Sequence, residues 1–95
     1  MITIRETKTF KNWIHDLKDR IAQSIINARI RRISSENFGD VKPVGNGIYE
    51  LRIDYAPGYR VYFTRQGHAS IILLCGGDKS TQRRDIETAV RMTQN

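Results

Sequence analysis

The 95-residue sequence has few of the side chains that bind metals or form disulfides. Its single cysteine, Cys75, cannot form an intramolecular disulfide, which favours a protein of the reducing cytoplasm. The two histidines, His15 and His68, have no cysteine near them in the sequence, so we expect no metal site. They also offer no supporting arrangement for a Ser-His-Asp or Cys-His nucleophile. The sequence therefore indicates a protein that works without a metal or another cofactor.

Long apolar runs are missing as well. The longest covers residues 71–75, whereas a transmembrane helix needs about 20 apolar residues. Residues 1–5 lack the apolar segment and the small-residue cleavage site of a signal peptide. We therefore expect a cytoplasmic protein that does not enter a membrane. At this length it should form a single domain, residues 1–95, around one hydrophobic core.

Positive charge, in contrast, is abundant. Sixteen Lys and Arg residues against ten Asp and Glu residues give a formal net charge of +6. This excess predicts attraction to polyanions, either nucleic acid or an acidic protein partner. The alternative is that the charge only keeps the protein soluble.

The first part of the chain is predicted to be mostly helical. Residues 2–4 favour a short first strand. From Lys8 onward, apolar residues recur three and four positions apart, which predicts an amphipathic helix capped by Thr7 or Thr9. We expect a break near residues 18–20 and a second helix after it. The apolar face of that second helix should consist of Ile21, Ala22, Ile25, Ile26, Ile30 and Ile33.

The second part of the chain predicts a sheet. Three segments bounded by turn sequences predict an antiparallel meander of strands at residues 48–54, 59–64 and 69–75. The unbroken apolar run at residues 71–75 indicates a central strand that is covered on both faces. Pro43 places a preceding extended segment at a sheet edge or a bulge. A last helix, capped by Ser80 or Thr81, completes the order β-α-α-β-β-β-α of an α+β domain.

Side-chain alternation sorts the meander into two faces. The apolar face consists of Tyr49, Leu51, Ile53, Val61 and Phe63. The polar face consists of Glu50, Arg52, Arg60, Tyr62 and Thr64. Arg52 and Arg60 should therefore lie near each other on a basic face that also carries a tyrosine. We expect the chemistry of the protein on this polar face.

Three more cations follow the meander. Lys79 comes after the last strand, and Arg83 and Arg84 lie on the first turn of the last helix. The N-terminus of that helix adds backbone N–H groups that favour an anion. With Arg52 and Arg60, these residues form a constellation suited to phosphate, which arginine binds bidentately.

Two members of the polar face also have simpler interpretations. Arg52 could pair with Glu50 or Asp54 as an ordinary strand neighbour. Tyr62 could stack on a nucleic-acid base or only cover the sheet, and the sequence favours neither.

Four strings of residues resemble one known family. They are Gly-Asp-Val-Lys at residues 39–42, Tyr-Glu-Leu-Arg-Ile at 49–53, Pro-Gly-Tyr-Arg-Val-Tyr-Phe at 57–63 and Gly-Gly-Asp-Lys-Ser-Thr-Gln at 76–82. Together with the order of elements, they resemble the RelE/ParE toxin superfamily, and more narrowly the HigB-like addiction module killer proteins of type II toxin–antitoxin systems. The resemblance implies a microbial RNase-type fold, with a small, mostly antiparallel twisted sheet backed by helices. It also implies a toxin that inhibits translation by cutting mRNA in the ribosomal A site without metal.

The resemblance also implies roles for three residues. Arg60 matches the arginine that stabilises the phosphate. Arg52 falls where the best-studied members carry a lysine proposed as base, and Lys79 falls close to the arginine proposed as acid. We expect RNA contacts from Tyr62, Arg83, Arg84 and Lys42. The sequence departs from the family pattern in two respects: residues 84–86 lack the tyrosine that those members use, and an arginine remains protonated and makes a poor base.

Partners follow from the same resemblance. We expect a cognate helix-turn-helix antitoxin, and a ribosome carrying mRNA as the target. Two other functions remain open: a ParE-type toxin that poisons DNA gyrase without hydrolysis, and a non-catalytic RNA-binding module. The cluster of Arg52, Arg60 and Lys79 favours the nuclease, because a gyrase binder does not require it. The lack of a repeated aromatic platform disfavours the RNA-binding module.

Overall fold

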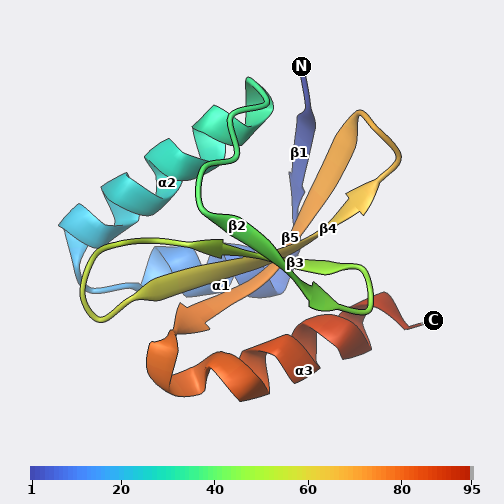
Figure 1. The fold of residues 1–95 in the computed structure, drawn as a ribbon. Helices are drawn as coiled ribbons and strands as arrows, with labels where there is room; N and C mark the ends of the chain where they lie inside the picture. The colour runs from blue at the N-terminus through green and yellow to red at the C-terminus, as the bar shows by residue number, and fades with distance from the viewer. Residues whose placement is uncertain (95) are drawn as a thin grey trace.

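The computed structural model describes residues 1–94, which form a five-stranded sheet with helices on both of its faces (Figure 1). The elements are β1 (Thr3–Glu6), α1 (Lys8–Asp16), α2 (Arg20–Ser34), β2 (Val41–Gly45), β3 (Ile48–Arg52), β4 (Tyr59–Gln66), β5 (Ser70–Asp78), the 3₁₀ helix η1 (Lys79–Thr81) and α3 (Gln82–Thr93). The strand order is β1-β5-β4-β3-β2, with β1 parallel to β5 and all other neighbours antiparallel. The predicted α+β class and the meander of β3, β4 and β5 are confirmed.

The extended segment before the meander is a full strand, β2, at one edge of the sheet. Pro43 lies opposite Tyr49, and the register of the β2–β3 pair shifts between Pro43 and Gly45. Proline lacks an N–H group, so an edge strand with a bulge tolerates it. The prediction from Pro43 is therefore confirmed.

The two N-terminal helices are separated where the sequence predicts a break. Thr7 caps α1, because its hydroxyl accepts a hydrogen bond of 3.0 Å from the Phe10 amide. Asp19 caps α2, because its Oδ1 accepts bonds of 3.0 and 3.1 Å from the amides of Ile21 and Ala22. A cap of this kind satisfies N–H groups that have no partner inside the helix.

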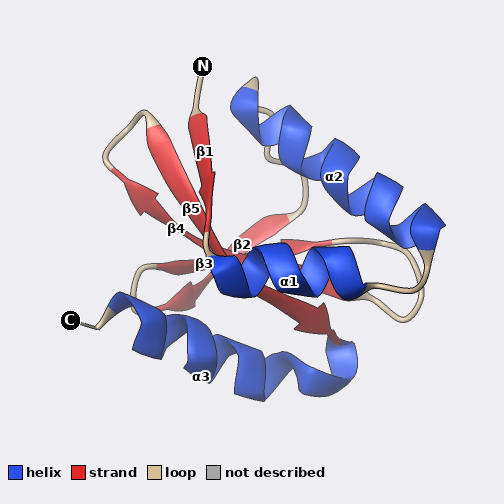
Figure 2. Ribbon diagram, turned by 180° about the vertical axis from the view of Figure 1, so that it is seen from behind, coloured by secondary structure: helices blue, strands red, loops and turns tan. Residues whose placement is uncertain are grey.

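The sheet has a core on each side, and not the single hydrophobic core expected from the length of the chain. Helices α1 and α2 cover one face, and α3 runs along the other, as the view from behind shows (Figure 2). On the first side, Phe10 and Ile26 pack against Leu51, Val61 and Phe63. On the second side, the cluster consists of Ile48, Tyr62, Leu74, Cys75 and Ala89, with Ile86 and Val90 packed against it. Both faces of β5 are therefore covered, as its unbroken apolar run predicts.

Two consecutive glycines let helices from both faces approach β5. The sequence suggested that Gly76 and Gly77 follow the last strand, but both lie within it. A Cβ atom on Gly76 would overlap the indole of Trp13 in α1, and one on Gly77 would overlap the carboxylate of Asp85 in α3. The glycine pair thus sets the distance of α1 and α3 from the sheet.

One prediction about the helices is wrong, and another is confirmed only in part. Ile21 is 63% exposed and does not belong to the apolar face of α2, whose buried residues are Ala22, Ile26, Ile30 and Ile33. An offset of one residue from Ala22 is about 100° around a helix, so Ile21 points away from this stripe. Thr81, one of the two predicted caps, is the N-cap residue of α3, but the side-chain cap bond at the start of the last helical segment comes from Asp78. Asp78 caps η1, since its Oδ1 accepts a bond of 2.8 Å from the Ser80 amide, and Thr81 makes no side-chain cap bond to α3.

Among residues 1–94, every helix is too short or too polar to cross a membrane.

Candidate functional site

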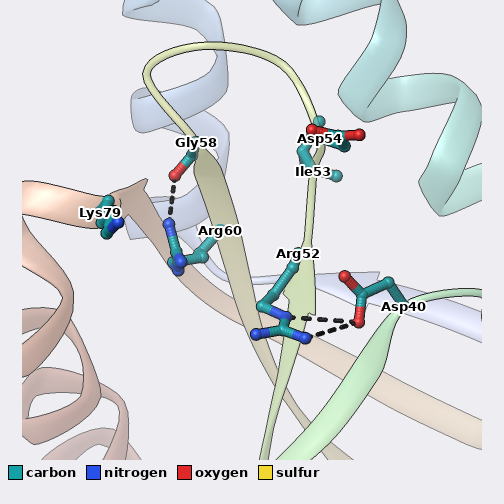
Figure 3. A pocket seen from close by; sticks show the side chains of 7 residues that line it. All are labelled: Asp40, Arg52, Ile53, Asp54, Gly58, Arg60 and Lys79. Atoms are coloured by element: carbon teal, nitrogen blue, oxygen red, sulfur yellow. Dashed lines mark hydrogen bonds and ion pairs between the residues drawn. The ribbon is translucent and has the colours of Figure 1, made fainter.

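A shallow cavity of about 300 Å³ brings the three principal cations together (Figure 3). Its lining consists of Asp40, Arg52, Ile53, Asp54, Gly58, Arg60 and Lys79. Arg52 in β3 and Arg60 in β4 are direct partners across the antiparallel ladder. Lys79 enters from the end of β5, one position after Asp78, which is itself opposite Tyr59. The predicted proximity of Arg52, Arg60 and Lys79 is therefore a property of the fold.

Arg52 is held by a carboxylate that the sequence did not suggest. Its Nε and Nη2 donate hydrogen bonds of 3.3 and 3.1 Å to Oδ1 of Asp40, in the loop before β2. The side chains of Arg52 and Asp40 are 40% and 54% exposed, so water screens this pair. The predicted pairing of Arg52 with Glu50 or Asp54 is therefore wrong. The backbone amide of Arg52 donates a hydrogen bond of 2.9 Å to the Asp40 carbonyl, which holds this end of β3 beside the loop of Asp40.

Arg29 of α2 fixes that loop. Its Nη1 donates to the Arg52 carbonyl at 2.8 Å, and its Nη2 donates to the Phe38 carbonyl at 3.2 Å. Between them, Gly39 has a φ of +67°, and a Cβ there would lie 2.8 Å from Nη2 of Arg29. Arg29 therefore joins a helix, a loop and the end of β3, and positions Asp40 beside Arg52.

Arg60 is the most enclosed cation of the cavity. Its side chain is 12% exposed, its Nη1 donates to the Gly58 carbonyl at 2.6 Å, and its Nε lies 3.7 Å from Oε2 of Glu50. Glu50 is fully buried, and the same Oε2 accepts bonds from the Tyr62 hydroxyl at 3.0 Å and from Nε2 of Gln82 at 2.7 Å. The buried carboxylate of Glu50 thus lies beside the guanidinium of Arg60. Hydrogen bonds connect this carboxylate to β4 and to the start of α3.

Tyr62 does not lie where a nucleic acid could reach it. It is fully buried beneath α3 and donates its hydroxyl proton to Glu50. Burial, with the nearby negative charge of Glu50, raises the pKa of Tyr62 well above its ordinary value. The predicted RNA contact from Tyr62 is therefore wrong. The residue does cover the sheet, which was the second interpretation of its position.

The remaining predicted RNA contacts lie outside the cavity. Lys42 is exposed on β2 opposite Glu50 in the ladder, and Arg83 and Arg84 are exposed on the first turn of α3. Nε2 of Gln82 donates a hydrogen bond to the buried Glu50 and so holds the start of α3 against the sheet. Arg83 and Arg84 are the next two residues of this helix. Whether these three cations contact RNA remains a prediction.

The arrangement is suited to one phosphate group. Arg52 and Arg60 are like charges in opposite positions, which is normally destabilising, but each has its own carboxylate, Asp40 or Glu50. Lys79 adds a third cation at the exposed rim. No group of three or more His, Cys, Asp or Glu side chains in residues 1–94 is placed to hold a metal ion.

Solved structures share this fold. The E. coli toxin RelE, determined in the free state as an arginine-substituted mutant, matches with a TM-score of 0.73 and 12% identity, covering 98% of each chain. A chain of the toxin–antitoxin complex RelBE2 from Mycobacterium tuberculosis matches with a TM-score of 0.64 and 22% identity, covering 82% of this chain and 98% of that one. The protein therefore has the fold of the RelE toxins.

Sequence comparison gives the family. The model of the family "Phage derived protein Gp49-like (DUF891)" matches residues 8–94, and the chain belongs to this family. An uncharacterized protein of Haemophilus influenzae is 53% identical over 93 residues, which cover 98% of this chain and 94% of that protein.

Proposed function

We propose that this protein is the HigB-like toxin of a type II toxin–antitoxin pair, and that it inhibits translation by cutting mRNA on the ribosome without a metal. The observation that carries the proposal is the cavity in which Arg52, Arg60 and Lys79 meet. Three cations around one small cavity suit a single phosphodiester of an extended RNA strand. The fold shared with the toxin RelE supports the same function.

The proposed reaction moves the RNA phosphate from the 5′-oxygen to the neighbouring 2′-oxygen. The 2′-hydroxyl gives its proton to solvent water as it attacks phosphorus, the bond from phosphorus to O5′ breaks, and O5′ takes up a proton. The products are a 2′,3′-cyclic phosphate and a free 5′-hydroxyl. Arg60 offsets the negative charge that grows on the phosphate oxygens, and Lys79 supplies the proton to O5′.

Arg52 acts in this proposal as a second ligand of the phosphate. Its guanidinium stays protonated at any ordinary pH, so it does not remove the proton of the 2′-hydroxyl. It is partly exposed and already bonded to Asp40 through Nε and Nη2. Because the ribosome itself orients the mRNA, electrostatic stabilisation and positioning by this protein contribute directly to the rate.

A toxin of this kind requires a neutralising partner, and we propose a cognate helix-turn-helix antitoxin. A relative of the same fold is found in a toxin–antitoxin complex. The net charge of +6, with exposed Lys79, Arg83 and Arg84, favours an antitoxin that covers the cavity with acidic side chains. Arg60→Glu should then weaken the complex, and a complex that survives high salt and is unaffected by this change would contradict an electrostatic cover.

Inducible expression in a bacterial host tests the proposed activity. Wild type should stop incorporation of labelled amino acids and create new mRNA ends within translated frames, whereas Arg60→Ala and Lys79→Ala should do neither. Lys11→Ala removes an exposed cation of α1, far from the cavity residues in sequence and on another element, and should behave as wild type. Growth arrest with DNA damage and intact mRNA would instead indicate a gyrase poison.

A further inference from the structure

A buried negative charge lies next to Arg60 with part of its hydrogen-bonding capacity unused. Glu50 is fully buried, and its Oε1 has no hydrogen-bond partner among the described residues. The buried Nε of Arg60 likewise has none, since 3.7 Å to Glu50 is an ion-pair distance and not a hydrogen bond. Burying two charges with incomplete hydrogen bonding is costly, and apolar side chains in the same place are often as stable or more so. A functional reason for the pair is therefore needed.

The surroundings of Glu50 fix its carboxylate in one place. Tyr62, from the neighbouring strand, and Gln82, from the first position of α3, both donate to Oε2. These two donors come from different elements, so the carboxylate is braced across the interface of the sheet and α3. Neither donor lines the cavity, and neither does Glu50 itself.

The Arg60 guanidinium is consequently constrained on two sides. Gly58 accepts from Nη1, and Glu50 lies beside Nε. Nη2 has no hydrogen-bond partner among residues 1–94, although Arg60 lines the cavity. The plane of the guanidinium is thus set by protein groups before any ligand arrives, which reduces the cost of orienting it during a reaction.

We propose that Glu50 is a positioning residue, which acts through Arg60 by fixing the orientation of the guanidinium toward a bound phosphate, and that Gln82 couples this orientation to α3. This inference rests on the proposed function, because the phosphate is that of the cleaved RNA. Glu50 itself does not touch the substrate.

Cleavage kinetics on purified, mRNA-programmed ribosomes distinguish a positioning role of Glu50 from a general loss of folding or of RNA binding. Glu50→Gln keeps the shape of the side chain and an oxygen for Tyr62 and Gln82, but removes the charge beside Nε. It should lower kcat roughly 10- to 100-fold, the scale of a misplaced catalytic group, with little change in KM. Glu87→Gln, at an exposed position of α3, is the matched control and should leave both constants unchanged.

A double-mutant comparison gives the decisive readout. If Glu50 acts only through the Arg60 guanidinium, Glu50→Gln should cause little further loss in an Arg60→Lys background, which keeps a cation at this position and, we expect, a measurable rate of cleavage. Equal losses in the two backgrounds would overturn the proposal, because they would indicate an effect independent of Arg60. A rise in KM alone would also overturn it.

The NMR signal of the Arg60 Nε–H group tests the orientation without any activity. Its assignment follows from its disappearance in Arg60→Lys. Glu50→Gln and Gln82→Ala should both shift this signal, while most backbone amide signals stay in place. An unmoved Nε–H signal would refute the positioning role even in an active toxin. A wild-type protein that does not cleave mRNA would instead refute the proposed function. The NMR signal would still show whether Glu50 orients the Arg60 guanidinium.

Discussion

Alanine at Gly77 should displace the start of α3 from the sheet. A Cβ at this position would overlap Oδ2 of Asp85 and come within 2.7 Å of Oγ1 of Thr81. Those two atoms are hydrogen-bonded to each other at 2.5 Å, so they can keep this bond only if both move away from β5 together, with the start of α3. Overpacking of this kind costs about 1–3 kcal/mol. For a domain of this size, each kcal/mol lowers Tm by about 4–8 °C, so Gly77→Ala should lower Tm by roughly 4–24 °C.

Thermal unfolding followed by circular dichroism measures this effect. The double variant Gly77→Ala with Asp85→Ala removes the overlapping carboxylate and should recover part of the lost Tm, whereas independent effects would add. The same displacement moves Gln82 away from Glu50, so mRNA cleavage should fall in Gly77→Ala at temperatures where the protein is folded. A wild-type Tm for Gly77→Ala would refute the view that this glycine exists to admit α3.

Three further predictions follow from other contacts. The hydrogen bonds that Asp19 accepts from the first amides of α2 and from the Tyr55 hydroxyl lower the pKa of its carboxyl group, so its contribution to stability is complete above the ordinary pKa and is lost as the pH falls through the lowered pKa. Asp19→Asn should therefore reduce the loss of stability on the acid side of a stability–pH curve, and an unchanged acid side would contradict this. Burial raises the pKa of the Cys75 thiol to about 12, so it should resist thiol reagents at pH 8 until the protein unfolds, and rapid labelling of the native protein would contradict its burial. Tyr62→Phe removes a hydrogen bond to a buried carboxylate and should cost about 1.5–3 kcal/mol in denaturant unfolding; a neutral result would show that another donor replaces the hydroxyl.

Local patterns in the sequence predict much of the fold. The three- and four-residue spacing of apolar residues indicates the two N-terminal helices, and alternation indicates the strands. The pairing of Arg52 with Arg60 was predictable because a hairpin places residues opposite each other by counting from its turn. Pro43 marked the edge strand for an equally local reason, the missing N–H group.

Contacts between distant parts of the chain were not predictable in this way. Alternation assigns Glu50 and Tyr62 to the polar face, but it does not say that α3 covers them there. The bond between Arg52 and Asp40 depends on a loop whose path Arg29 sets from α2. Thr81 was predicted as a cap of α3, but the 3₁₀ helix before it was not, so the cap bond from Asp78 could not be predicted among several neighbouring residues with suitable side chains.

Cleavage of mRNA on the ribosome by the cavity residues Arg52, Arg60 and Lys79 can be tested directly by primer extension. A defined mRNA is incubated with the purified protein, with and without ribosomes stalled at a known codon. Wild type should create a new end at the stalled A site only when ribosomes are present, and Arg60→Ala should create none. An mRNA that stays intact with wild-type protein on such ribosomes would contradict the account.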